Sequence, residues 1–151
     1  MKVIQYGPGH TPIDTTAYPA HLAEIADRLP PGARAYAEAP WHYDFHHRRC
    51  PHDAWLESLI ISESPDHPRR VDLTLRLLGA YHDAHLELRY TTVTRYTTTM
   101  LPGHRGHGDL IVDEVTLADD GHVSHELAFE TGTLQITCRD LTATWIDRPP
   151  A

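Results

Sequence analysis

The chain has 151 residues, of which 40% are hydrophobic and 23% charged, and its formal net charge is −8 at pH 7. This length and composition fit one globular domain, and no apolar run approaches the roughly 18–20 residues that a membrane-spanning helix needs. The acidic balance argues against a nucleic-acid groove, because phosphate binding depends on clustered Lys and Arg side chains. The sequence therefore predicts a single domain, residues 1–151, that binds neither membrane nor nucleic acid.

The N-terminal residues lack the apolar stretch and cleavage site of a secretory signal, which predicts a cytoplasmic location. Cys50 and Cys138 are the two cysteines, and two in a chain of this size do not indicate a disulfide framework. The chain is rich in histidine, and full protonation of its 13 imidazoles would oppose the net charge of −8. We therefore expect solubility or association to change near pH 6.5, about the ordinary pKa of histidine.

Residues 1–50 are irregular and Pro-rich, and they contain one predicted helix. Leu22, Ile25 and Leu29 recur at helical spacing after Pro19, a residue that suits a first helical turn. The sequence Pro30-Pro31-Gly32 ends this pattern. Because the apolar face is narrow, we expect the helix to pack across a sheet.

Residues 51–147 are β-rich, since apolar and polar side chains alternate there with the period of strands that have one buried face. The clearest pattern spans 71–77, and others fall at 55–61, 86–99, 110–117, 123–129 and 134–145. Asp119-Asp120-Gly121 is typical of a tight hairpin. The apolar phase shifts after Cys138, which we interpret as a β-bulge at Arg139-Asp140 within one continuous strand.

Together these patterns predict an α+β fold. Its main element is a predominantly antiparallel sheet of about six strands, of which the last three form a meander. The single N-terminal helix packs on that sheet.

Two His-rich segments offer ligands for zinc, which binds imidazole, thiolate and carboxylate groups. The candidates in the first segment are His46, Cys50, His52 and Asp53, and those in the glycine-rich second segment are His104, His107 and Asp109. Neither spacing matches a known zinc motif, and a solvated loop is the alternative for both. Cys50 is also a candidate activated thiolate, because a nearby imidazolium lowers the pKa of a thiol.

Five short segments resemble a group of uncharacterised small bacterial α+β proteins: Leu77–Asp83, Val93–Tyr96, His107–Leu110, Val123–Leu127 and Cys138–Leu141. The resemblance covers about residues 50–146. Some related proteins act as immunity proteins in polymorphic toxin systems. The resemblance therefore implies a single-domain inhibitor of a cognate toxin, and it identifies no catalytic residue.

The acidic balance is consistent with such a role, because a negative inhibitor is steered electrostatically to a basic partner. We therefore expect a non-enzymatic protein-binding domain without a cofactor, and a basic protein or toxin as its partner. The candidate contact residues are acidic or aromatic: Trp41, Tyr43, Asp44, Asp113, Glu114, Asp119 and Asp120. The alternative is a metal-binding domain or a metal-dependent hydrolase that uses zinc in the His-rich loops.

Overall fold

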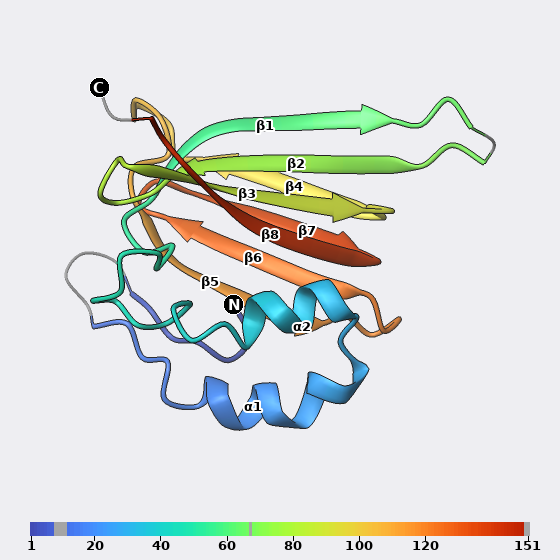
Figure 1. The fold of residues 1–151 in the computed structure, drawn as a ribbon, viewed down its shortest axis with the longest axis horizontal. Coiled ribbons are helices and arrows are strands. Elements are labelled where there is room, and N and C mark those ends of the chain that lie inside the picture. The colour runs from blue at the N-terminus through green and yellow to red at the C-terminus, as the bar shows by residue number, and fades with distance from the viewer. Residues whose placement is uncertain (8–11, 67, 150–151) are drawn as a thin grey trace.

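The structure is a computed structural model that describes residues 1–7, 12–66 and 68–149. Eight strands form two four-stranded antiparallel sheets in this part of the chain, and two short α-helices pack beside them (Figure 1). In chain order the elements are α1 (Tyr18–Ile25), the 3₁₀-helix η1 (Ala26–Arg28), α2 (Pro31–Ala37), β1 (Trp55–Glu63), β2 (Val71–Leu78), β3 (Ala84–Thr91), β4 (Arg95–Met100), β5 (Leu110–Leu117), β6 (Val123–Phe129), β7 (Gly132–Cys138) and β8 (Asp140–Asp147). The predicted α+β class with a predominantly antiparallel sheet is confirmed.

The first sheet has the strand order β1-β2-β3-β8, and the second has the order β4-β7-β6-β5. Alternation of side chains decides which face of each strand is buried. In β2, for example, Leu73, Leu75 and Leu77 are fully buried, whereas the residues between them are partly exposed. The main apolar core lies where these buried faces meet, and α2 contributes to it.

A long two-stranded ribbon joins the two sheets. β3 pairs with β8 in the first sheet and β4 pairs with β7 in the second, so both chains of the ribbon bend together between the sheets. At the bend Thr92 has a positive φ of 51°, and the Arg139 N–H donates to the Thr91 carbonyl oxygen at 3.0 Å.

This ribbon corrects two predictions. The apolar phase shifts at Arg139 because β7 ends and the chain enters the other sheet, so the proposed bulge within one strand is wrong. The predicted strand over 86–99 is likewise two strands, β3 and β4, in different sheets. The meander itself is present as β5-β6-β7, but β8 is not part of it.

Main-chain hydrogen bonds also link the sheets on the opposite side. The Asp53 N–H donates to the Leu110 carbonyl oxygen at 2.9 Å, and the Leu110 N–H donates to that of Ala54 at 2.9 Å. The start of β1 is therefore held beside the start of β5.

The predicted helix over Pro19–Leu29 corresponds roughly to α1 and η1, and α2 follows it directly. Asp140 at the start of β8 accepts hydrogen bonds from the N–H groups of Gly32 at 3.2 Å and Ala33 at 2.8 Å, so a strand residue caps α2. A Cβ atom at Gly32 would overlap the carbonyl oxygen of Leu141, and glycine thus permits the close approach of α2 to β8.

The N-terminal segment and α1 pack against β5 and β6. The Tyr18 hydroxyl donates to the Val115 carbonyl oxygen at 2.7 Å and accepts from the Val115 N–H at 3.2 Å. It therefore satisfies both main-chain groups of this residue at the edge of β5. Ile4 and Tyr18 form a second apolar cluster there with Val112 and Ala128. Within the described ranges, neither helix has the length and apolar character needed to cross a membrane.

Candidate functional site

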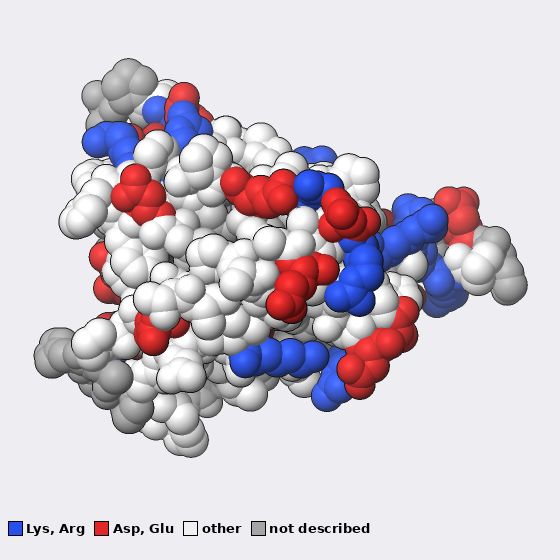
Figure 2. All heavy atoms as spheres, turned by 90° about the horizontal axis from the view of Figure 1, so that it is seen from below, with Lys and Arg blue, Asp and Glu red and all other residues white. Residues whose placement is uncertain are grey.

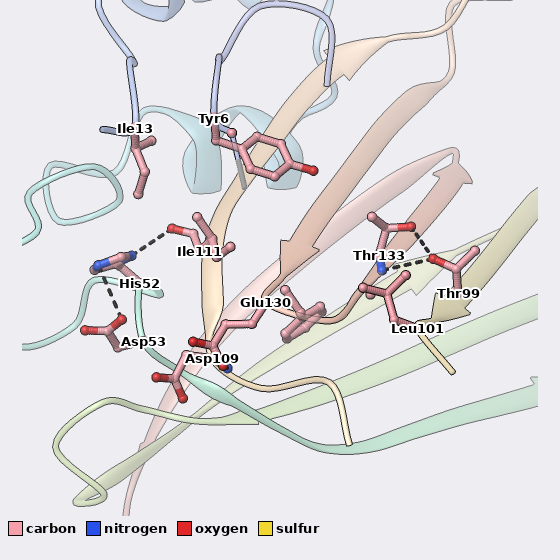
Figure 3. Close-up of a pocket in the computed structure, with 13 residues that line it drawn as sticks. Tyr6, Ile13, His52, Asp53, Thr99, Leu101, Asp109, Ile111, Glu130 and Thr133 are labelled. Atoms are coloured by element: carbon pink, nitrogen blue, oxygen red, sulfur yellow. Dashed lines mark hydrogen bonds and ion pairs between the residues drawn. The ribbon is translucent and has the colours of Figure 1, made fainter. Parts of the chain in front are cut away.

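An open pocket of about 880 Å³ lies where the N-terminal segment meets the starts of β1 and β5 and the ends of β4 and β6 (Figure 3). Tyr6 and Ile13 project into it from the N-terminal segment, and Thr99, Leu101 and Thr133 line the opposite side. Apolar and hydroxyl groups therefore form much of the wall.

The ionisable groups of this pocket are predominantly acidic. The described lining residues include three carboxylates, Asp53, Asp109 and Glu130, and none of them is Lys or Arg. His52 also lines the pocket, and its Nδ1 lies 2.7 Å from the carbonyl oxygen of Ile111. A carbonyl oxygen can only accept, so Nδ1 carries a proton and Nε2 faces the Asp53 carboxylate at 3.3 Å.

Local backbone geometry places the carboxylates. Asp53 has a positive φ of 63°, a conformation that aspartate tolerates better than most residues, and the Asp53 N–H is bonded to β5. Gly108 also has a positive φ, of 73°, and a Cβ atom there would overlap the Glu130 carboxylate. Glycine at this position therefore allows Glu130 to lie against the chain beside Asp109.

Trp55 orients one of these carboxylates. The indole Nε1–H of Trp55 donates to Asp109 Oδ1 at 2.6 Å, and Trp55 itself is 47% exposed. A ligand that contacts Asp109 would consequently change the surroundings of this indole ring.

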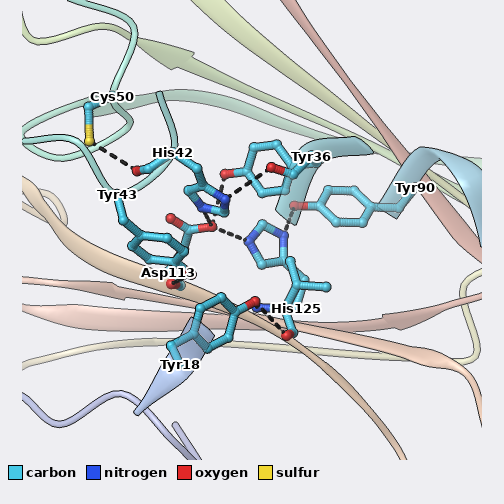
Figure 4. Close-up of polar contacts among 9 residues, drawn as sticks. Tyr18, Tyr36, His42, Tyr43, Cys50, Tyr90, Asp113 and His125 are labelled. Carbon is cyan, nitrogen blue, oxygen red and sulfur yellow. Dashed lines mark hydrogen bonds and ion pairs between the residues drawn. The ribbon is translucent and has the colours of Figure 1, made fainter. Parts of the chain in front are cut away.

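A second constellation, which we call the buried polar cluster, consists of Tyr36, His42, Tyr90, Asp113 and His125 (Figure 4). Asp113 Oδ2 is at its centre. It accepts hydrogen bonds from the Tyr36 hydroxyl at 2.9 Å and lies 2.8 Å from Nε2 of both His42 and His125. Nδ1 of His125 lies 2.8 Å from the Tyr90 hydroxyl.

The hydrogen-bond partners indicate the charges in this cluster. His42 Nδ1 lies 3.1 Å from the Tyr36 carbonyl oxygen, and its Nε2 faces Asp113, so both ring nitrogens face acceptors. We therefore assign His42 as an imidazolium paired with the Asp113 carboxylate. Burial raises the pKa of Asp113, but the charge on His42 and the hydrogen bonds from both imidazoles outweigh it, so the pKa lies well below its usual range.

The cluster connects elements that are distant in the sequence. α2 supplies Tyr36, the loop after α2 supplies His42, and β3, β5 and β6 supply the other three members. All five side chains are buried. Because no member is open to solvent, the cluster can hold the loop against the sheets but cannot contact a substrate from solution.

The thiols are equally unsuited to nucleophilic chemistry. Burial raises the pKa of Cys50 to about 12, and the Cys50 thiol donates to the carbonyl oxygen of His42 at 3.1 Å. Burial likewise raises the pKa of Cys138 to about 12. The activated thiolate considered for Cys50 is therefore contradicted, because the neighbouring imidazoles do not offset its desolvation.

The predicted zinc ligands do not converge. No group of three or more His, Cys, Asp or Glu side chains in the described part of the chain is arranged to hold a metal ion. His46 and His104 are exposed, Cys50 is buried, and His107 packs edge-on against Phe129. The remaining candidates do come together, but as part of the acidic pocket: His52, Asp53 and Asp109.

Two of the predicted contact residues are buried, so their prediction as surface contacts is wrong. Asp113 is 3% exposed and Glu114 is 2% exposed, so neither contributes to an acidic surface. Glu114 instead accepts hydrogen bonds from the backbone N–H groups of residues 2–4 at 2.6–2.9 Å. An acidic side chain in a strand can be buried wherever internal donors replace water, as they do at both positions.

The other predicted contact residues lie nearer the surface. Trp41 and Tyr43 are half-buried, whereas Asp44, Asp119 and Asp120 are exposed. Figure 2, which views the molecule from below, shows Asp and Glu interspersed with Lys and Arg on that face. The visible acidic residues do not merge into one surface there.

Tyr6 and Glu130 in the pocket, and most of the buried polar cluster, were not predicted from the sequence. His125 had one usable signal, because it occupies the apolar phase of its strand with Val123 and Leu127. Tyr90 likewise continues the apolar phase of Leu86 and Leu88, whereas Tyr36 and His42 have no comparable local signal. In comparisons with known proteins, no protein-family profile and no curated protein matches this chain.

Proposed function

We propose that this protein is a non-enzymatic binding domain whose acidic pocket receives a basic segment of a protein partner. The observation that carries the proposal is the lining of the pocket: three carboxylates beside apolar side chains, with no Lys or Arg among the described lining residues. A segment that combines arginine or lysine with apolar residues matches this chemistry.

The arrangement is also suited to recognition without rearrangement. Asp109 is held by Trp55, and Glu130 lies against Gly108, so these carboxylates are oriented before a ligand binds. Preorganised groups lose less conformational freedom on association. A binding role is further supported by the burial of both thiols and of the His–Asp cluster, which removes those groups from contact with a substrate.

Inhibition of a basic toxin, the role implied by the resemblance, would be one form of this binding. The net charge of −8 would steer such a partner towards the protein. Cys50 and Cys138 are free thiols, as expected in a reducing compartment. We therefore propose that the protein is cytoplasmic. With a candidate toxin in hand, the test is protection of cells that express it.

The pocket itself can be tested without a known partner. The probe is a dye-labelled peptide that alternates arginine and leucine, and the reference peptide alternates glutamate and leucine. Binding of the probe is measured by fluorescence anisotropy and by the emission of Trp55, with Trp55→Phe as the control for the second signal. We expect the association rate to fall as salt is raised, because salt screens exposed charges.

A matched pair of variants separates the pocket from net charge. The pocket variant combines Asp53→Asn, Asp109→Asn and Glu130→Gln, and the control combines Glu24→Gln, Asp119→Asn and Asp120→Asn, which lie at exposed positions elsewhere. We expect the pocket variant to weaken binding of the arginine peptide by about tenfold and the control to leave it nearly unchanged. Equal weakening by both variants would show that net charge alone attracts the peptide, and the proposal would be wrong.

A further inference from the structure

β4 is an edge strand whose outer side is open. It pairs only with β7 among the described strands, in an unbroken register from Arg95↔Thr137 to Met100↔Gly132. All six residues of β4 are exposed. The strand contains no proline and no acidic residue, so it lacks devices that commonly prevent edge strands from pairing with other chains.

The other strand edges in the described structure are covered by other groups or carry acidic residues. The Tyr18 hydroxyl occupies main-chain groups at the edge of β5, and α2 packs against β8. β1 has an irregular register between Leu56 and Ser58 and carries the acidic residues Glu57 and Glu63. Two copies of β1 would therefore bring like charges together, whereas two copies of β4 would not.

The pairing of β4 with β7 shows which way the main-chain groups of each β4 residue point. The Leu101 N–H donates to the Thr131 carbonyl oxygen at 2.7 Å. Every second residue counted back from Leu101 therefore directs its N–H and C=O groups towards β7. The residues between them are Tyr96, Thr98 and Met100. Their N–H and C=O groups point away from β7, towards the open edge of the sheet. These three residues are the ones that a further strand would bond.

We infer that β4 pairs with β4 of a second copy of this chain across a twofold axis at Thr98. In that antiparallel register Thr98 faces its own equivalent, Tyr96 faces the partner copy's Met100, and roughly six main-chain hydrogen bonds form. Tyr96 is 43% exposed and Met100 is 52% exposed in the monomer. The pairing covers both side chains with an aromatic–thioether contact.

The same register brings opposite charges together. Arg95 of one copy lies opposite Leu101 of the other and on the same face of the sheet, and Leu101 lines the acidic pocket. Glu130 precedes Thr131, the residue bonded to Leu101, so its main chain lies about two strand spacings, ~10 Å, from the partner copy's Arg95. An extended arginine side chain covers most of that separation. Arg95 has no carboxylate within ion-pair distance in the described monomer, so it is available for this contact.

Self-association needs no other partner and is therefore separate from the proposed binding of a basic segment. A single pair of six-residue strands buries little surface, so the dimer is weak and concentration-dependent. Sedimentation equilibrium over a wide concentration range should show a monomer–dimer equilibrium for the wild type. Hydrogen exchange should show that the amides of Tyr96, Thr98 and Met100 become more protected as concentration rises.

Three variants test the register. Thr98→Pro removes an outward N–H without breaking the ladder to β7, and it should abolish the dimer. Arg95→Glu should weaken the dimer by about tenfold, and adding Glu130→Arg should restore it. Arg28→Glu, an equal charge change at an exposed position in η1, should have no effect.

Circular dichroism first establishes that each variant is folded, and if Thr98→Pro is not, the charge-reversal pair decides the outcome. A wild-type protein that stays monomeric at every concentration would overturn the inference. So would a dimer that Arg95→Glu and Arg28→Glu affect equally.

Discussion

Replacing Asp113 with asparagine removes the charge at the centre of the buried polar cluster and changes the shape of the side chain very little. In the wild type, one carboxylate oxygen is shared by the Tyr36 hydroxyl and by the Nε2 atoms of His42 and His125, at 2.8–2.9 Å. The Asp113→Asn variant would leave the His42 imidazolium buried without its counter-charge. Removing one partner of a buried ion pair costs about 3–5 kcal/mol, so we expect a loss of this size in the free energy of unfolding.

The loss can be measured by urea unfolding at pH 7, followed by circular dichroism. For a chain of this length each kcal/mol lowers the melting temperature by about 2–4 °C, so Asp113→Asn should melt roughly 6–20 °C below the wild type. Asp119→Asn is the control, because it removes the same formal charge from an exposed turn. A loss of less than about 1 kcal/mol for Asp113→Asn would refute the assignment of a buried ion pair.

The contribution of Asp113 to the free energy of unfolding should also depend on pH. Folding lowers the pKa of Asp113, so this carboxylate contributes its full stabilisation above its unfolded pKa of about 3.9 and loses it progressively as the pH falls towards the folded value. The asparagine side chain of the variant has no such titration. Below about pH 4 the difference in unfolding free energy between wild type and variant should therefore narrow. A difference that widened as the pH fell from about 4 would contradict the direction of this shift.

Three further outcomes follow from the contacts. Tyr18→Phe should lose about 2–3 kcal/mol in unfolding free energy, because both main-chain groups of Val115 lose a buried partner; Tyr81→Phe, at an exposed position, should lose almost nothing. Cys50 and Cys138 should react with iodoacetamide at pH 8 only after unfolding, since burial raises both pKa values to about 12; rapid labelling of the native protein would contradict this. Asp140→Ala should lower the unfolding free energy by about 1 kcal/mol through loss of the α2 cap, and an unchanged thermal melt would show that the cap contributes nothing.

Much of the secondary structure could be read from the sequence, because it depends on local periodicity. The alternation of Leu73, Leu75 and Leu77 reflects one buried strand face, and the hairpin glycine, Gly121, has the positive φ of 81° that its turn requires. The candidate site was only partly accessible in this way. His52, Asp53 and Asp109 were singled out as possible zinc ligands, and the structure brings them together in an acidic pocket.

Local sequence patterns therefore indicate which segments are extended and which of their faces are apolar. Which strands pair and which charges are buried depends on contacts between distant parts of the chain. The phase shift at Arg139 is compatible with a bulge or with a change of sheet, and pairing of β8 with β3 selects the second. Asp113 resembles a surface acid in its strand, but imidazoles from two distant segments replace its hydration and allow its burial. Such donors come from parts of the chain that no local pattern connects, and for that reason only the folded structure reveals them.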